Sequence, residues 1–270
     1  MAFTETDTTG DYENVSPEQL RLFYATKASI NPNLSTPSIP PTVSQVHADT
    51  VAHQGSLAIM AVSDYQGMLQ NFFVGLLGAK RILEVGTFTG ASAIFFASAL
   101  QRNGVSGGPD AHGNRPLTCL EISEEYAAIA RQNFVQAGVD DYIDIVVGDA
   151  HHSLAELADQ TFDLIFLDAD KPSYTAYCQA ILNHHMLAPS GLIIADNTAF
   201  NNVTPFINIP APVASDATPL DVPFSGFPEE REHGQAIHEF NEYIRQEPSV
   251  EAVMLPLFTG ITLVRLLPSD

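Results

Sequence analysis

Acidic side chains follow five short apolar segments of this 270-residue chain. Each segment is rich in branched apolar residues, which is typical of a buried strand. If the strands are parallel, their carboxyl ends share one edge of a sheet, where ligands of such sheets bind. A solvated acidic rim accounts for any one of these acids but poorly for all five. The positions are Glu84, Glu121, Asp149, Asp168 and the pair Asp196-Asn197.

The first segment runs into a glycine turn, Gly86-Thr-Phe-Thr-Gly90, and then into a helix-forming run. A strand, a glycine turn and a helix form the front of a βαβ unit that binds nucleotide-like ligands, because glycine admits close backbone approach and the helix start offers free N–H groups. Glu84 would repel a pyrophosphate but suits an amine-bearing ligand. The spacing differs from the Gly-x-Gly-x-x-Gly of NAD-binding proteins, and a purely structural glycine turn is the alternative.

Two further acids extend this pocket. Glu121 ends the second strand, where an acidic residue accepts hydrogen bonds from the ribose hydroxyls of a nucleoside cofactor. Asp149 follows the third strand and is placed to accept from an adenine amino group. Together with Glu84, these residues predict a pocket for adenosine that carries an amino-acid tail.

Asp168, Asp196 and Asn197 form a second cluster of oxygen ligands at adjacent strand ends. Carboxylate and amide oxygens suit Mg²⁺, Mn²⁺ or Ca²⁺, and three protein ligands leave positions open for water and substrate. Lys171 follows Asp168 closely and is a candidate general base if the cation and burial favour its neutral form. The alternatives for Lys171 are a solvated lysine at a helix start or a partner for Asp170.

The elements that must position these groups follow from apolar periodicity and from cap and breaker residues. Helices are predicted at 16–29, 43–53, 64–77, from 91 onward, and at 124–137, 151–158, 172–187 and 229–246. Strands are predicted at 82–85, 117–122, 142–147, 162–167, 191–195, 250–257 and 260–267. Ser63 and Ser123 are expected to cap two of the helices, and Gly78 and Gly138 to end them. Alternating strands and helices predict an α/β fold with helices on both faces of a mostly parallel sheet.

The chain divides into a tail expected to be disordered at 1–15, a helical extension at 16–59 and a main domain at 60–270. The segment 103–116 is predicted to be an exposed loop. The segment 201–230 is rich in Pro, Ala and Ser and is predicted to be an irregular insertion that covers the substrate.

The chain carries 11 basic and 32 acidic residues, a net charge of −21. Such a surface disfavours nucleic acid and anionic membranes as partners. The two cysteines, Cys119 and Cys178, lie in apolar contexts and indicate a reducing compartment. Neither a signal peptide nor an apolar run of about 20 residues is evident, so we expect a soluble cytoplasmic protein.

Four segments, at 84–90, 162–171, 196–201 and 254–263, together resemble the cation-dependent O-methyltransferases, in order and spacing. The caffeoyl-CoA O-methyltransferases are the most similar branch, and catechol O-methyltransferase is a more distant relative. The segment 60–67 also matches the family's Met-x-x-Ser-x-x-x-Gly pattern over the cofactor, with Val62 in place of a threonine. The resemblance covers about 60–267.

This resemblance implies a class I methyltransferase fold, which is Rossmann-like, with a seven-stranded sheet whose last strand is antiparallel. It also implies S-adenosylmethionine and a divalent cation as cofactors, and a homodimer. The residues expected to hold S-adenosylmethionine are Val62, Glu84, Gly86, Thr87, Ser92, Glu121, Asp149, Ala150 and Asp170. Asp168, Asp196 and Asn197 would bind the metal, Lys171 and Asp168 would act in catalysis, and Met60 and Asn201 would contact substrate.

The leading hypothesis is transfer of a methyl group from S-adenosylmethionine to a metal-coordinated hydroxyl of a small phenolic or enolic molecule, in secondary metabolism. The residues that grip coenzyme A in the plant enzymes have no match, and the charge of −21 disfavours that polyanion. One alternative is an NAD(P)-dependent oxidoreductase, against which Glu84 and the glycine spacing argue. The other is a methyltransferase fold that has lost methyl transfer.

Overall fold

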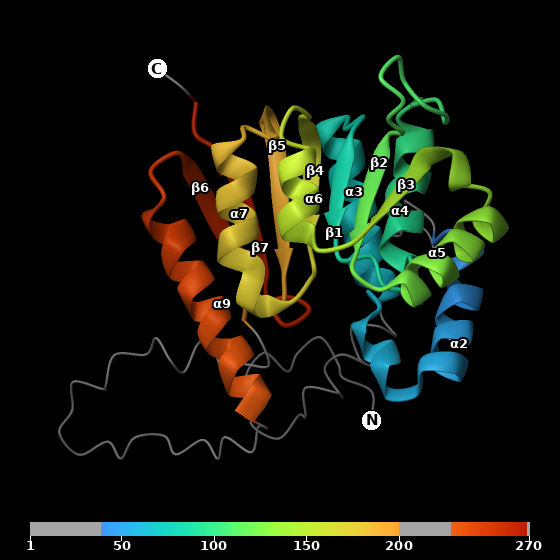
Figure 1. Cartoon of the computed structure of the whole chain (residues 1–270), viewed down its shortest axis with the longest axis horizontal. Helices are drawn as coiled ribbons and strands as arrows, with labels where there is room; N and C mark the ends of the chain where they lie inside the picture. The colour runs from blue at the N-terminus through green and yellow to red at the C-terminus, as the bar shows by residue number, and fades with distance from the viewer. Residues whose placement is uncertain (1–38, 200–227, 269–270) are drawn as a thin grey trace, which may run out of the picture. The chain divides into compact units, whose positions relative to one another are not determined.

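Seven strands form a single sheet in the order β3-β2-β1-β4-β5-β7-β6 (Figure 1). Strands β1 to β5 are parallel, and β7 lies antiparallel between β5 and β6. The computed structural model describes residues 39–199 and 228–268. The predicted α/β fold with a mostly parallel sheet is confirmed. The strands are β1 (Ile82–Val85), β2 (Leu117–Glu121), β3 (Ile143–Val147), β4 (Phe162–Leu167), β5 (Leu187–Asp196), β6 (Val250–Leu255) and β7 (Ile261–Leu266).

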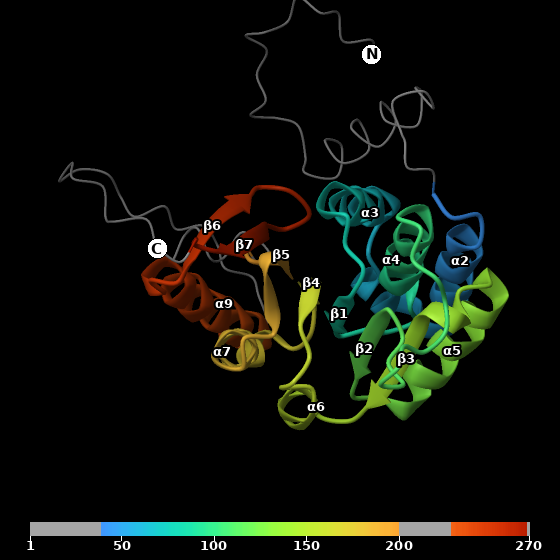
Figure 2. The same cartoon turned by 90° about the horizontal axis from the view of Figure 1, so that it is seen from above.

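Helices cover both faces of the sheet. Figure 2 shows α3, α4 and α5 on one face and α6, α7 and α9 on the other. This arrangement buries the parallel strands on both sides, as the continuous apolar segments of the sequence require. The helices are α2 (Val43–Gln54), α3 (Asp64–Leu77), α4 (Ala91–Arg102), α5 (Glu124–Ala137), α6 (Ala150–Glu156), α7 (Tyr174–Asn183) and α9 (Pro228–Gln246). Three 3₁₀ helices complete the described elements: η2 (Gly55–Met60), η3 (Asp140–Tyr142) and η4 (Lys171–Ser173).

Two helices have the ends that the sequence predicts. Ser63 accepts a hydrogen bond from a backbone N–H in the first turn of α3, and Ser123 does the same for α5. Gly78 and Gly138 end these helices in the left-handed conformation, which glycine adopts without strain. Caps of this kind fix the point at which each helix starts, and therefore which side chains face the sheet.

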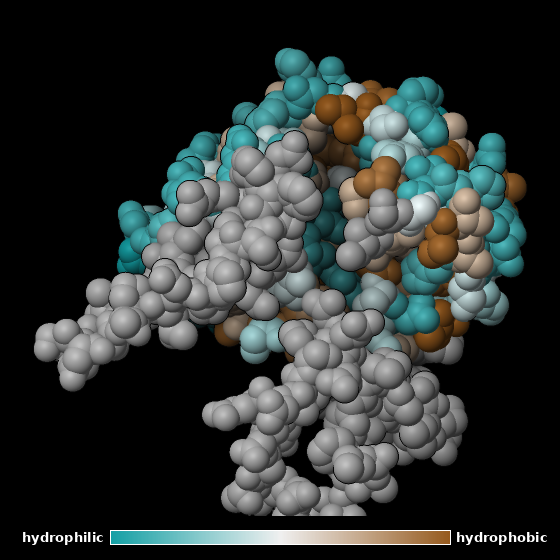
Figure 3. Space-filling model, turned by 90° about the horizontal axis from the view of Figure 1, so that it is seen from below, coloured by the Kyte–Doolittle hydropathy of each residue, from teal (hydrophilic) through white to brown (hydrophobic). Residues whose placement is uncertain are grey.

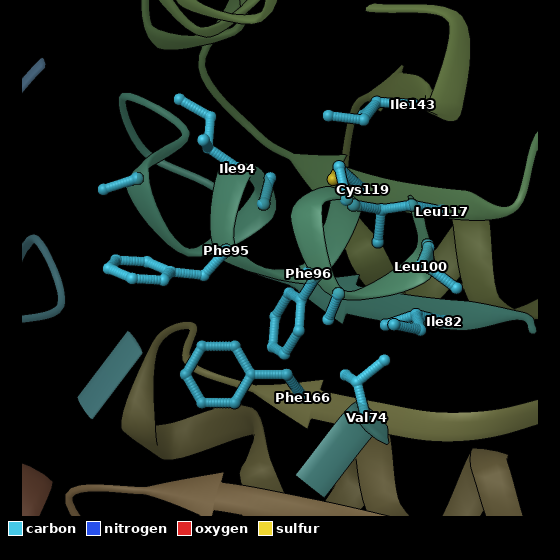
Figure 4. Packing of buried hydrophobic residues seen from close by; sticks show 14 of the residues in the cluster. Val74, Ile82, Ile94, Phe95, Phe96, Leu100, Leu117, Cys119, Ile143 and Phe166 are labelled. Atoms are coloured by element: carbon cyan, nitrogen blue, oxygen red, sulfur yellow. The ribbon is translucent and has the colours of Figure 1, made fainter. Parts of the chain in front are cut away.

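The apolar core lies in two clusters, one on each face of the sheet. Strands β1 and β2 are buried along their whole length. In the cluster of Figure 4, the ring of Phe96 on α4 packs edge-to-face on Phe166 of β4, with ring centroids 5.6 Å apart. Close packing of this kind holds the strand ends at fixed positions, which the site at the edge of the sheet requires.

Helix α2 packs into the same core as the sheet. Val43 and Val46 are completely buried, and the hydroxyl of Thr50 lies 2.9 Å from that of Thr89 in the glycine turn. The compact unit therefore begins at Ile39, within the segment that the sequence assigned to the helical extension. The predicted tail at 1–15 and helix at 16–29 lie outside the described residues, and so does most of the predicted insertion at 201–230.

The boundaries between 171 and 191 differ most from the sequence prediction, and the helix predicted to reach 187 ends at Asn183. Strand β5 begins at Leu187 instead of 191, because Leu187 already pairs with Phe162 before a shift of register. The helix predicted from 172 is divided: η4 comes first, and the α-helix α7 begins only at Tyr174. In the part of the chain that the structure describes, no helix is both long and apolar enough to cross a membrane.

Candidate active site

The carboxyl ends of the five parallel strands lie along one edge of the sheet. Val85 is paired with Leu120 on one side and with Leu167 on the other, and Leu167 is paired with Ala195. The residues that carry the acidic groups end or directly follow these positions, so they lie next to one another. Figure 3 views this edge and shows a hollow whose visible floor is hydrophilic.

Both glycines of the turn after β1 are required by the backbone and by its neighbours. Gly86 has a φ of 94°, and a Cβ placed there would lie 2.2 Å from the carbonyl oxygen of Asp168. Gly90 has a φ of 89°, and its Cβ would lie 2.4 Å from the ring of Phe134 on α5. The turn is therefore packed directly against the loop that carries Asp168, which brings the two predicted clusters together.

Glu84 is completely buried at the end of β1. Burial raises the pKa of its carboxyl from 4.5 to about 7. The thiol of Cys119 donates to Oε2 at 3.2 Å, whereas Oε1 makes no hydrogen bond within the described residues. A buried carboxylate oxygen without a partner is costly unless a ligand supplies the missing donor.

Glu121 shapes the glycine turn. Its Oε2 accepts hydrogen bonds from the backbone N–H groups of Thr87, at 3.2 Å, and Phe88, at 2.8 Å. Its Oε1 accepts from the N–H of Ser123 at 2.9 Å. The carboxylate thus joins the ends of β1 and β2, and its Oε1 keeps one lone pair for a ligand because a carboxylate has about four acceptor positions.

Two residues predicted to bind the cofactor make hydrogen bonds within the protein. Asp149 caps α6 by accepting from the N–H of His151 at 2.9 Å, and Ala150 is the first residue of that helix. Asp170 is exposed and accepts from Tyr177, at 2.8 Å, and from Ser173, at 2.5 Å. These contacts fix the loops after β3 and β4.

The other residues predicted to contact cofactor or substrate differ in exposure. Thr87, Ser92 and Val62 are almost completely buried. Met60 ends η2 and is 47% exposed, so its side chain is free to meet a ligand. Asn201 lies outside the described residues.

Asp168 and Asp196 follow and end the adjacent strands β4 and β5. Asp196 is only 4% exposed. Burial, and then the negative charge of Asp168, raise its pKa to about 7. Its carboxylate accepts from the amide of Gln66, at 2.7 Å, and from the backbone N–H of Asn197, at 2.8 Å. Two carboxylates so placed repel each other, and a cation between them would relieve that repulsion.

Asn197 is held by the turn between β6 and β7. It adopts a left-handed backbone conformation with a φ of 56°, which asparagine tolerates better than most residues. Its amide nitrogen donates to the hydroxyl of Thr259 at 2.9 Å. The backbone N–H of Ala199 also donates to the carbonyl of Thr259, at 2.9 Å. The amide nitrogen is thereby occupied, which leaves the amide oxygen as the ligand atom.

Lys171 is buried beside the two carboxylates. Its Nζ donates to Oδ1 of Asp168, at 3.1 Å, and to the hydroxyl of Tyr174, at 2.8 Å. That tyrosine hydroxyl lies 3.1 Å from the backbone carbonyl oxygens of both Leu167 and Asp196. The lysine is therefore neither solvated nor bonded to Asp170, the two alternatives that its sequence position left open.

The donor set of this cluster fits a hard divalent cation. It contains two carboxylates and one amide oxygen, the ligand types that Mg²⁺, Mn²⁺ and Ca²⁺ prefer. Among the described residues, no group of three or more His, Cys, Asp or Glu residues could hold a metal ion. A cation at Asp168 and Asp196 would therefore need the amide of Asn197 and oxygen ligands from water or substrate.

Comparison with known proteins agrees with this fold and identifies the family. The family described as O-methyltransferase matches residues 35–267. The O-methyltransferase ankF of Aspergillus thermomutatus is 28% identical over 229 residues, 85% of this chain and 88% of that protein. Caffeoyl-CoA O-methyltransferase 1 of Eucalyptus globulus is 29% identical over 233 residues, which cover 85% and 83% of the two chains. The SAH-bound methyltransferase PaMTH1 of Podospora anserina superposes with a TM-score of 0.73 at 26% identity, covering 91% of this chain and 96% of that one.

The fold and these matches define a class I methyltransferase. The chain belongs to the O-methyltransferase family and is an S-adenosylmethionine-dependent O-methyltransferase. The resemblance found in the sequence is confirmed at this level, and the oxidoreductase alternative gains no support.

Sequence reasoning missed two residues of the site. Gln66 lies inside the segment 60–67, but nothing in the sequence indicated that its side chain reaches Asp196. Tyr174 connects Lys171 to the backbone of β4 and β5, and only the packing of α7 reveals this.

Proposed function

We propose that this enzyme transfers the methyl group of S-adenosylmethionine to a hydroxyl of a small phenolic or enolic molecule, with that hydroxyl held by a divalent cation. The observation that carries the proposal is the position of Asp168 and Asp196 at adjoining strand ends, where the negative charge of Asp168 helps to raise the pKa of the buried Asp196. A cation such as Mg²⁺ or Mn²⁺, when bound, would lower the pKa of a hydroxyl and fix its orientation.

The cofactor would lie across the ends of β1 and β2. The unpartnered Oε1 of Glu84 supports a contact with the ammonium group of the methionine part. The remaining lone pair on Oε1 of Glu121 supports a hydrogen bond from a ribose hydroxyl. The remaining residues proposed to line this pocket are Val62, Gly86, Thr87, Ser92, Asp149, Ala150 and Asp170.

Lys171 or Asp168 would accept the proton of the substrate hydroxyl. In an in-line displacement, a bond forms between the hydroxyl oxygen and the methyl carbon while the bond from that carbon to sulfur breaks, and the sulfonium becomes a thioether. The hydroxyl proton must leave, and the amine of Lys171, if it is neutral, or the carboxylate of Asp168 can accept it. Most of the rate gain would come from positioning and electrostatics.

The substrate class rests on the charge of the molecule and on the site. The Eucalyptus relative is named for caffeoyl-CoA. A net charge of −21 disfavours such a polyanion, so we propose an uncharged phenol or enol of secondary metabolism. Met60 and Asn201 would contact it. We further propose a cytoplasmic homodimer, a location supported by the free, buried thiols of Cys119 and Cys178.

Chelation tests the cation directly. We expect EDTA to abolish methyl transfer to a catechol-type acceptor, and excess Mg²⁺ or Mn²⁺ to restore it. Binding of S-adenosylmethionine, measured by calorimetric titration, should survive chelation because Glu84 and Glu121 lie on other strands. Asp196→Asn should mimic chelation, whereas the exposed Asp159→Asn should behave like the wild-type enzyme. Full activity in EDTA, without a gain on adding metal, would remove the cation from the proposal.

A further inference from the structure

One polar side chain of α3 reaches the candidate cation site. Gln66 is 5% exposed, and its amide nitrogen donates to Oδ2 of Asp196 at 2.7 Å. The two residues are 130 positions apart in the chain. A neutral amide therefore connects the first turn of α3 to the end of β5.

The local sequence offered this side chain another partner. A serine followed three residues later by glutamine, as in Ser63 and Gln66, is the pattern of a capping box. In a complete box, the glutamine side chain returns to the backbone N–H of the serine. Here the serine hydroxyl accepts from the N–H of Gln66 at 3.3 Å, but the glutamine amide donates to Asp196. The side chain of Gln66 thus binds the carboxylate of Asp196 and leaves the capping box incomplete.

The two oxygens of Asp196 have separate donors. Oδ1 accepts from the N–H of Asn197, and Oδ2 accepts from Gln66. One bond alone would leave the carboxylate free to turn about its side-chain torsions, whereas two bonds on opposite oxygens fix its plane. Each oxygen retains a second lone pair for a further partner.

The two carboxylates of the pair are held by different means. Asp168 is bonded by the ammonium of Lys171, which offsets its charge. Asp196 is bonded by an amide, which orients the group but leaves its negative charge for a cation. A carboxylate that binds a metal ion commonly depends on a neighbouring hydrogen-bond donor for its orientation.

We propose that Gln66 is a positioning residue that fixes the carboxylate of Asp196 in the orientation in which it binds a divalent cation. The inference rests on the cation site proposed above. It makes cation affinity depend on the position of the first turn of α3, which directly follows the segment 60–63.

A matched pair of substitutions on α3 tests this role. Gln70 lies one turn further along the helix and is 1% exposed, and neither atom of its amide has a hydrogen-bond partner in the described part of the chain. Gln66→Met and Gln70→Met therefore remove buried amides of equal size, of which only one is bonded to Asp196. Binding of Mn²⁺ to the full-length protein is followed by the electron paramagnetic resonance signal of the free ion.

We expect Gln66→Met to weaken Mn²⁺ binding roughly 10- to 100-fold, the usual effect of losing a residue that orients a metal ligand. Gln70→Met should bind Mn²⁺ like the wild-type protein. In turnover assays, Gln66→Met should need more Mn²⁺ for half-maximal rate, while its kcat at saturating Mn²⁺ stays near the wild-type value. The affinity for S-adenosylmethionine should not change.

The outcomes separate this inference from the proposed function. Wild-type protein that binds no Mn²⁺ would overturn both the cation site and the role of Gln66. If the wild type binds Mn²⁺ and Gln66→Met binds it equally well, the cation site stands and the positioning role is wrong. Should Gln66→Met fail to fold, Gln66→Asn replaces it, because the shorter side chain keeps a buried amide but withdraws it from Asp196, so Mn²⁺ binding should again weaken. Mn²⁺ binding by Gln66→Asn equal to that of the wild type would also overturn the role.

Discussion

Glu84 is a buried carboxylate whose protonation links stability to pH. Its pKa is 4.5 in the absence of burial and about 7 in the folded protein. Between these values, the folded state holds a proton that the unfolded state has released. Stability therefore falls as pH rises from 4.5 to 7, and the loss is complete above 7. The ligand-free protein is therefore less stable above pH 7, but the ionised Glu84 can accept a hydrogen bond from a cationic group.

Replacement of Glu84 by its neutral isostere should remove this cost. We expect the free energy of unfolding of Glu84→Gln to gain about 1–3 kcal/mol over that of the wild type between pH 5 and pH 8. Urea unfolding at the two pH values measures the difference, with the exposed Glu156→Gln as control. The same variant should bind S-adenosylmethionine more weakly. An advantage that does not grow between pH 5 and 8 would show that Glu84 stays ionised.

At the scale of elements, the glycine turn is fixed by its contact with α5. A left-handed backbone costs a residue with a Cβ about 1–2 kcal/mol, and overpacking adds about 1–3 kcal/mol. Gly90→Ala should incur both costs because its Cβ meets Phe134. Gly78→Ala should incur only the cost of the left-handed backbone. The φ of Gly78 is 59°, and no atom lies within 4 Å of a Cβ placed there. Urea unfolding of both variants should give the larger loss for Gly90→Ala, and equal losses would mean that Phe134 moves aside.

The elements themselves were largely predictable from the sequence. The caps Ser63 and Ser123 and the stops Gly78 and Gly138 are local signals, and each determined one helix end. The start of β5 was not predictable, because Leu187 joins the strand through pairing with Phe162, a partner distant in sequence. The division of the helix after Asp170 depends likewise on tertiary contacts.

The positions of the acidic residues at the strand ends were the predictable part of the candidate site. Parallel strands bring their carboxyl ends to one edge, so Glu84, Glu121 and Asp168 could be placed together from the sequence alone. The contacts that orient them could not, because a hydrogen bond such as that of Gln66 with Asp196 has no local pattern.

At the scale of the whole molecule, the net charge of −21 opposes the compact state. Salt screens this repulsion, so we expect the Tm at pH 8 to rise by about 2–4 °C between low and moderate NaCl, which corresponds to roughly 1 kcal/mol. Differential scanning calorimetry measures the change. Close to the isoelectric point of about 4.5, the rise should vanish. A rise of the same size at that pH would indicate a general effect of salt.

The position of β7 between β5 and β6 has a consequence for the synthesis of the protein. Asn197 and Ala199 are held by Thr259, which lies 62 positions after Asn197, and the strand that pairs with β5 spans Ile261–Leu266. During translation, the ends of β1, β2 and β4 can form long before these residues leave the ribosome. The nascent chain would thus gain the cofactor-binding part of its site first and the support of Asn197 last. Methyl transfer would begin only after β7 has paired with β5.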